Sequence, residues 1–82
     1  MKDKYKYLKL IDRSLLNLIL NNSELEETEY KVVKNTLITE DLIEKMCGDL
    51  AISNSTYRNL QDTGLAKVHL TFCFIIRQAL KN

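Results

Sequence analysis

The sequence predicts an all-α single domain of four to five helices, and three observations predict it. The chain has 82 residues with no Pro and only two Gly, so the residues that punctuate an all-β protein are largely missing. Apolar residues make up 45% and charged residues 28%, which are ordinary values for a globular protein. Apolar side chains also recur at three- and four-residue steps, the spacing of a helical face. A chain this short builds one modest core.

The same composition argues against several functional classes. Two cysteines, Cys47 and Cys73, do not form a disulfide framework, and their apolar or small neighbours favour reduced thiols in the cytoplasm. With one His and no carboxylates clustered at ligand spacing, we expect no metal site, no cofactor and no enzymatic activity. The apolar-rich stretch 15–20 is far shorter than the ~20 residues that span a bilayer, and no signal-peptide cleavage site follows residues 8–20. We therefore expect a cytoplasmic protein without a membrane partner.

Residues 1–22 are predicted to form an N-terminal amphipathic helix from about Lys4 to Leu20. Its apolar stripe is wide, which indicates packing on two sides, either inside the domain or against a second subunit. The stripe consists of Leu8, Ile11, Leu15, Leu18 and Ile19, widened by Leu10, Leu16 and Leu20.

Residues 23–82 are predicted to hold the remaining helices. Ser23 with Glu26 three residues later is the pattern of a capping box, which starts a second helix that reaches about residues 35–37. Thr39 is the expected N-cap of a third helix, and Ser53 that of a fourth. The third helix is expected to bury Leu42, Ile43, Met46, Cys47 and Leu50.

A short turn at residues 51–53 separates the third and fourth helices. Two helices that cross closely over such a turn need a small residue in the first helix, another at the turn, and an apolar residue in the second helix. Cys47, Ala51 and Tyr57 meet these needs at spacings of four and six residues. The pattern predicts a helix-turn-helix near residues 42–62; the alternative is two ordinary packed helices with a short link.

Three segments carry a resemblance to a known family. Residues 46–59 (MCGDLAISNSTYRN) are similar to the pattern I-A-x-x-L-x-I-S-x-x-T-V-[KR]-x, and residues 65–68 (LAKV) to I-x-x-K-L. Upstream, residues 25–33 (LEETEYKVV) are similar to L-T-x-R-E-x-E-V-L. Together they resemble the LuxR-type DNA-binding domain of bacterial response regulators, over about residues 25–82. The resemblance implies a helix-turn-helix that binds DNA.

The sequence departs from that family at three positions. Gly64 falls inside the expected recognition helix, Gln61 stands where the family is apolar, and His69 stands where it has Gly. An interior Gly costs a helix about 1 kcal/mol relative to Ala. An alternative therefore ends the fourth helix near Gly64 and begins a separate helix around Leu65 or Thr71.

Five polar residues at the start of the fourth helix are candidate DNA-binding residues. Asn54, Ser55 and Thr56 lie at its N-terminus, where phosphate or base contacts are favourable, although Thr56 can instead serve as a structural hydroxyl. Arg58 and Asn59 are expected to point outward, with donors and acceptors suited to guanine and adenine edges.

The resemblance adds Lys67, which matches a position near the DNA backbone in the family, and it also assigns Arg58 and Asn59 to DNA contacts. Asp62 follows Arg58 by one turn, so it either repels phosphate or pairs with Arg58. The net charge of +1 is uneven: residues 1–22 and 51–82 each carry +3, and residues 23–50 carry −5. A DNA-binding face is therefore expected at the basic ends of the chain.

The first functional hypothesis is a small DNA-binding transcriptional regulator that acts as a dimer and inserts residues 54–62 into the major groove. The dimer would form through the N-terminal helix or through an apolar C-terminal seam of Phe72, Phe74, Ile75 and Ile76; alternatively, these residues pack on the N-terminal helix. The second hypothesis is a helical protein-binding module or anti-regulator that binds a transcription factor or polymerase subunit without binding DNA. The acidic stretches 24–29 and 40–49 favour it.

Overall fold

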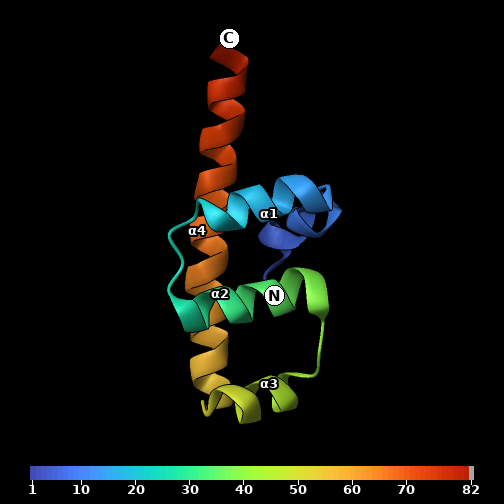
Figure 1. Cartoon of the computed structure of the whole chain (residues 1–82), viewed down its shortest axis with the longest axis vertical. Coiled ribbons are helices and arrows are strands. Elements are labelled where there is room, and N and C mark those ends of the chain that lie inside the picture. Colours follow the sequence, from blue (N-terminus) through green and yellow to red (C-terminus); the bar gives the residue numbers. More distant parts are fainter. Residues whose placement is uncertain (82) are drawn as a thin grey trace.

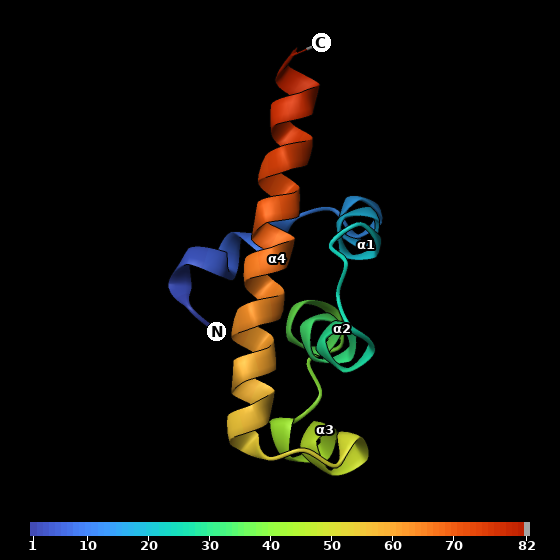
Figure 2. The ribbon, with the colours of Figure 1, turned by 90° about the vertical axis from the view of Figure 1, so that its left-hand side faces the viewer.

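One long helix, α4 (Asn54–Lys81), organises the computed structural model, which describes residues 1–81. Three shorter helices cross it at successive heights (Figure 1): α1 (Arg13–Asn21), α2 (Glu27–Lys34) and α3 (Ile43–Leu50). A 3-10 segment, η1 (Asp3–Leu10), lies on the opposite side of α4 from α1 and α2 (Figure 2), and a π-helical segment, η2 (Asn35–Thr39), continues α2. Residues 1–81 contain no strand, so the predicted all-α single domain is confirmed.

A single core joins the N-terminal segment to the rest of the chain. Residues 1–22 contribute about half of its members, so this segment packs inside the domain. The buried members are Tyr5, Leu8, Leu16, Ile19, Leu20, Val33, Leu37, Leu65 and Val68.

The N-terminal segment is not the continuous helix that its spacing predicts. It is interrupted at Ile11 and Asp12, which adopt extended ψ values of 138°. The Asp12 carboxylate accepts hydrogen bonds from the backbone N–H groups of Ser14 (3.0 Å) and Leu15 (3.4 Å), so it is the N-cap of α1. The prediction of one helix from Lys4 to Leu20 was therefore wrong, because an unrecognised cap restarts the chain in a new direction.

The second helix begins three residues later than predicted. Its capping box is formed by Glu26 and Glu29, and the Glu26 N–H donates to Glu29 Oε1 at 3.3 Å. Ser23 is instead buried, and its hydroxyl donates to the Ile19 carbonyl at 2.6 Å. Glu24 between them has a left-handed φ of 53°, so the chain turns before α2 starts.

The third helix also begins three residues late, and its predicted buried side is only half-buried at Met46, Cys47 and Leu50 and is exposed at Leu42 and Ile43. Thr39 ends η2, Glu40 turns the chain with a φ of 56°, and Leu42 is the N-cap of α3. Residues 43–50 are all described, and none of them is buried. Leu42 is 77% exposed, because α3 lies across the end of α4 instead of inside the core (Figure 1).

The fourth helix continues unbroken through Gly64, so the alternative of two separate helices was wrong. A Cβ at Gly64 would overlap the Val33 Cγ2 methyl and lie 3.0 Å from Glu29 Cγ. The missing side chain therefore lets α2 cross α4 closely. Gln61 is accommodated because its amide donates to the Thr36 hydroxyl at 3.0 Å. In the described part of the chain, no helix is both long and apolar enough to cross a bilayer.

Candidate nucleic-acid interface

The junction between α3 and α4 is a turn of three residues, as predicted. Ala51 ends α3 in the left-handed conformation (φ 55°, ψ 46°), and the Ile52 N–H donates to the Cys47 carbonyl at 3.0 Å. Ser53 starts α4, because its hydroxyl accepts a hydrogen bond from the Thr56 N–H at 3.1 Å. The predicted cap at Ser53 is confirmed.

The packing across this junction differs from the predicted pattern. Of the three residues expected to meet there, only Tyr57 is buried; Cys47 is half-buried and Ala51 is exposed. Ala51 therefore serves the turn through its backbone conformation and not through side-chain packing.

Tyr57 is anchored by a buried asparagine that sequence reasoning missed. The Asn35 amide donates to Tyr57 Oη at 3.0 Å and to the Asp41 carbonyl at 3.1 Å. The Asp41 N–H donates back to Asn35 Oδ1 at 2.8 Å. Asn35 thus fixes both the loop before α3 and the first turn of α4, which sets the position of the turn between them. The only sequence signal for it is a single Asn within an apolar periodic segment.

Five of the six predicted DNA-binding residues lie together on the first two turns of α4. All five side chains are exposed at the end of the molecule opposite the C-terminus (Figure 1): Asn54, Ser55, Thr56, Arg58 and Asn59. The buried Tyr57 between them holds the opposite face of the helix against the core. An α-helix with one free polar face at its N-terminus is the element that the major groove of DNA admits.

Two of these five residues also take part in local hydrogen bonds. Asn54 Oδ1 accepts from the Cys47 thiol at 3.2 Å, which ties α4 back to α3. The Thr56 and Ser53 hydroxyls are 3.0 Å apart, so Thr56 belongs to the cap of α4. Ser55, Arg58 and Asn59 are exposed and take no part in these bonds.

Lys67, the sixth predicted residue, lies apart from the others. It follows Arg58 by nine residues, which places it about 180° around the helix. Its ammonium donates to Glu29 Oε1 at 2.7 Å, and the Thr63 hydroxyl donates to Glu29 Oε2 at 2.8 Å. Lys67 therefore joins α4 to α2 and is not part of the exposed polar face.

The carboxyl group of Glu29 has a lowered pKa in this cluster in spite of its burial. Burial alone would raise the pKa of its carboxyl group, but hydrogen bonds from Lys67, Thr63 and the Glu26 backbone outweigh burial and lower the pKa. The same hydrogen bond raises the pKa of Lys67. The pair therefore links α2 to α4 at this position.

Asp62 is paired with the basic N-terminus and not with Arg58. Lys2 Nζ lies 3.9 Å from Asp62 Oδ2, and both side chains remain about half exposed. An exposed pair of this kind contributes less than about 1 kcal/mol to stability. Its importance is positional, because it brings a positive charge beside the free face of α4 and offsets the carboxylate there.

The four residues of the predicted apolar seam divide into two pairs. Phe72 and Ile75 are half-buried against the core, and the Phe72 ring lies 5.3 Å from the Tyr7 ring. Phe74 and Ile76 are exposed. The core therefore accounts for the first pair only.

No known protein family, curated protein or solved structure matches this chain. The support for a function comes from the geometry of α3 and α4 and from the charges around them.

Proposed function

We propose that this protein is a small transcriptional regulator that binds double-stranded DNA as a dimer, with the first turns of α4 in the major groove. The observation that carries the proposal is the free polar face at residues 54–59, presented at the end of the molecule by a three-residue turn from α3. The resemblance of residues 46–59 to the LuxR-type pattern supports the same assignment.

Four of the five side chains of the face have a chemical role in this proposal, and the fifth, Thr56, belongs to the cap of α4. Arg58 carries a forked guanidinium that pairs with guanine O6 and N7, and Asn59 has the donor and acceptor that pair with adenine. Asn54 and Ser55 stand beside the backbone N–H groups of the first helical turn, which favour a phosphate. Arg58 and Asn59 would therefore recognise the bases, whereas Asn54 and Ser55 would position the helix on the DNA backbone.

The charge distribution supports binding at this end once the N-terminus is included. Lys2 lies beside Asp62, and Lys4 and Lys6 are exposed on the adjoining η1 segment. Lys6 is paired with Asp3 at 2.9 Å and Lys2 lies 3.9 Å from Asp62, so Lys4, which forms no ion pair with the described residues, is the clearest candidate for a phosphate contact. A few such contacts give a weak affinity that decreases as salt rises, with a modest slope.

Fluorescence anisotropy with mixed duplex DNA at low and moderate salt tests the proposal. We expect binding at low salt that weakens as salt rises, and a preferred sequence on selection from a random library. The Arg58→Ala/Asn59→Ala variant should fold and lose the sequence preference. Arg13→Ala/Asn17→Ala is the matched control, because it removes the same residue types from the exposed face of α1. A folded wild-type protein that does not bind at low salt would overturn the proposal.

A second candidate, a protein-binding module, is favoured by the surface of α3. Leu42 and Ile43 are 77% and 38% exposed, and they lie beside the exposed acidic residues Glu44 and Asp49. The exposed Lys45 lies between these two acidic residues in the sequence, so the rim is charged and mainly acidic. Exposed apolar side chains with a polar rim are typical of a protein interface. Under this hypothesis, Leu42→Ser/Ile43→Ser would abolish capture of a basic regulator or polymerase subunit, and the Arg58 and Asn59 substitutions would not.

A further inference from the structure

The C-terminal end of α4 exposes apolar side chains that the domain does not cover. This segment, residues 70–81, is called the α4 tail below, and it projects beyond α1 (Figures 1 and 2). Its exposed apolar residues are Leu70 (67%), Phe74 (61%), Ile76 (40%) and Leu80 (81%). A projecting helix with this much exposed apolar surface is unfavourable in water unless another surface covers it.

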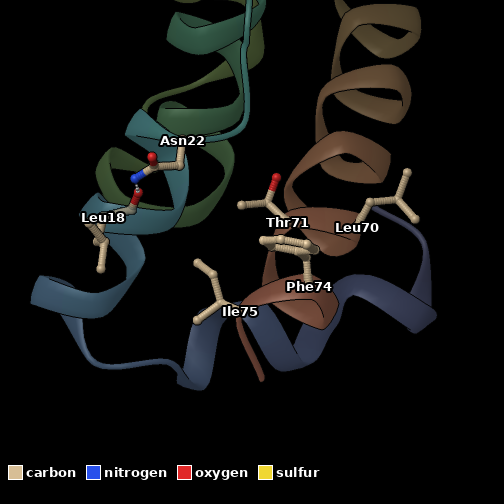
Figure 3. Close-up of a pocket in the computed structure, with 6 residues that line it drawn as sticks. All are labelled: Leu18, Asn22, Leu70, Thr71, Phe74 and Ile75. Carbon is tan, nitrogen blue, oxygen red and sulfur yellow. Dashed lines mark hydrogen bonds between the residues drawn. The ribbon is translucent and has the colours of Figure 1, made fainter. Parts of the chain in front are cut away.

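An open apolar hollow lies where the α4 tail leaves the domain. It has a volume of about 500 Å³. Figure 3 shows Leu18 and Asn22 of α1 across from Thr71, Phe74 and Ile75 of α4. Leu18 is itself half exposed, so the apolar surface of the tail extends onto α1.

The outer face of the α4 tail has the residue spacing of a helix-pairing seam. Leu70, Cys73, Arg77 and Leu80 follow one another at steps of three, four and three residues, which is the spacing of the a and d positions of a coiled coil. Phe74 lies on one side of this seam and Ile76 on the other. The inner face of the tail already packs on the core through residues such as Phe72.

We infer that the α4 tail pairs in antiparallel orientation with the α4 tail of a second copy of this chain, around a two-fold axis that crosses the seam midway between Cys73 and Arg77. In this register Leu70 of each copy lies opposite Leu80 of the other, and Cys73 lies opposite Arg77. The seam is therefore self-complementary, as an isologous interface must be. Because Leu70 also lines the hollow, Leu80 of the other copy would lie at the edge of that hollow.

Charge selects the antiparallel orientation. A parallel pair in register would place the two Arg77 side chains face to face in the seam. No acidic residue follows Asp62 in the sequence, so nothing on either tail would compensate them. The antiparallel register sets each Arg77 against a thiol instead, and like charges then lie farther apart.

The exposed area fits a second copy that binds weakly. The apolar side chains of the tail and Leu18 expose roughly 500 Å² per copy, a patch size that marks an interaction site on a monomer. Complete burial of two such patches would cover at most about 1,000 Å², which is the lower limit for a specific interface. We therefore expect a weak, reversible dimer.

The pairing also sets the distance between the two polar faces. Asn54 lies 21 residues before the two-fold axis, so the two starts of α4 would be about 60 Å apart at 1.5 Å per residue. This distance is close to two turns of B-DNA, at ~34 Å per turn, and far from one turn. The half-site spacing rests on the proposed DNA-binding function, whereas the pairing itself does not.

Sedimentation velocity of the full chain across a range of protein concentrations tests the pairing without DNA. We expect a reversible monomer–dimer equilibrium. The Leu70→Glu/Leu80→Glu variant should remain helical, because both side chains are exposed in the monomer, and its dimer dissociation constant should rise by roughly 100-fold or more. Leu42→Glu is the matched control, because Leu42 is equally exposed but lies at the other end of the molecule. A monomeric wild type, or a dimer lost only in Leu42→Glu, would overturn the inference.

Disulfide cross-linking tests the orientation in a Cys47→Ser background. In the antiparallel register the Cα atoms of position 73 of one copy and position 77 of the other lie about 5 Å apart, and the two Cys73 Cα atoms about 8 Å apart. The Cys47→Ser/Arg77→Cys protein should therefore cross-link rapidly under mild oxidation. Two controls with a single cysteine should not cross-link rapidly. They are Cys47→Ser, which keeps only Cys73, and Cys47→Ser/Cys73→Ser/Arg77→Cys, which has a cysteine only at position 77. Rapid cross-linking of either control would indicate a parallel pair and overturn the register.

Discussion

Gly64 of α4 lies directly against the Val33 side chain of α2, and no Cβ fits between them. Val33 is fully buried at this crossing, so the contact lies at the centre of the core. The crossing also sets the height at which α2 meets α4, ten residues beyond the start of the polar face. Gly64, which is by itself unfavourable inside a helix, therefore permits α2 to pack closely on α4.

The first prediction concerns this contact. Gly64→Ala should lower the free energy of unfolding by up to about 2 kcal/mol, because overpacking costs ~1–3 kcal/mol and the gain in helix propensity offsets about 1 kcal/mol of it. Gly48→Ala is the matched control, since a Cβ at Gly48 meets no atom within 4 Å. It should stabilise the protein by up to about 1 kcal/mol. Urea unfolding followed by circular dichroism measures both.

A double variant checks that Val33 is the cause. Val33→Ala should make room for the new methyl group, so Gly64→Ala should be less costly in the Val33→Ala background than in the wild type. Strictly additive effects would show that the cost of Gly64→Ala arises elsewhere.

The second prediction concerns pH. The pKa of Glu29 is lower in the folded protein than in the unfolded chain, so its stabilisation is present above the unfolded pKa of about 4.3 and is lost as pH falls through the folded pKa. Glu29→Gln should cost roughly 2 kcal/mol at pH 7 and weaken the dependence of stability on pH below about 5. Glu27→Gln, on an exposed carboxylate of the same helix, is the control. Equal acid sensitivity in wild type and Glu29→Gln would exclude this explanation.

The third prediction concerns the buried asparagine. Asn35→Ala removes three hydrogen bonds and leaves the Asp41 backbone and Tyr57 Oη without that partner. It should cost about 3 kcal/mol, whereas Tyr57→Phe removes one bond and should cost about 1 kcal/mol. Amide exchange should show faster exchange at the Asp41 N–H in Asn35→Ala only. Unchanged exchange there would mean that Asn35 does not hold the loop.

The sequence predicts the turn into α4 well and the helix starts before it poorly. Ser53 caps α4 as expected, because a hydroxyl before an N-terminal polar run is a strong local signal. The starts of α2 and α3 were missed because Glu24 and Glu40 adopt the left-handed conformation. Glu rarely does so, and only the surrounding fold determines that it does here.

Tertiary packing also explains the other differences. Local propensity favours a break at Gly64, but the close approach of Val33 makes a Gly necessary inside one continuous helix. The free polar face was predictable from the sequence. Four of its five residues flank Tyr57, and an apolar residue that faces the core turns its polar neighbours toward solvent. The separation of Lys67 from that face was not predictable, because it depends on the buried partner Glu29.

The last prediction concerns the carboxylate beside the polar face. Asp62 lies one turn beyond Arg58, and Lys2 offsets its charge only partly because both side chains are exposed. Asp62→Asn should therefore tighten DNA binding at low salt by a few-fold, and the gain should shrink as salt screens the repulsion. Glu27→Gln removes the same charge from α2 and should change the affinity less. If both variants gain the same DNA affinity, the net charge of the protein and not the position of Asp62 limits binding. The polar face of α4 would then not be distinguished from the rest of the surface as the DNA-binding site.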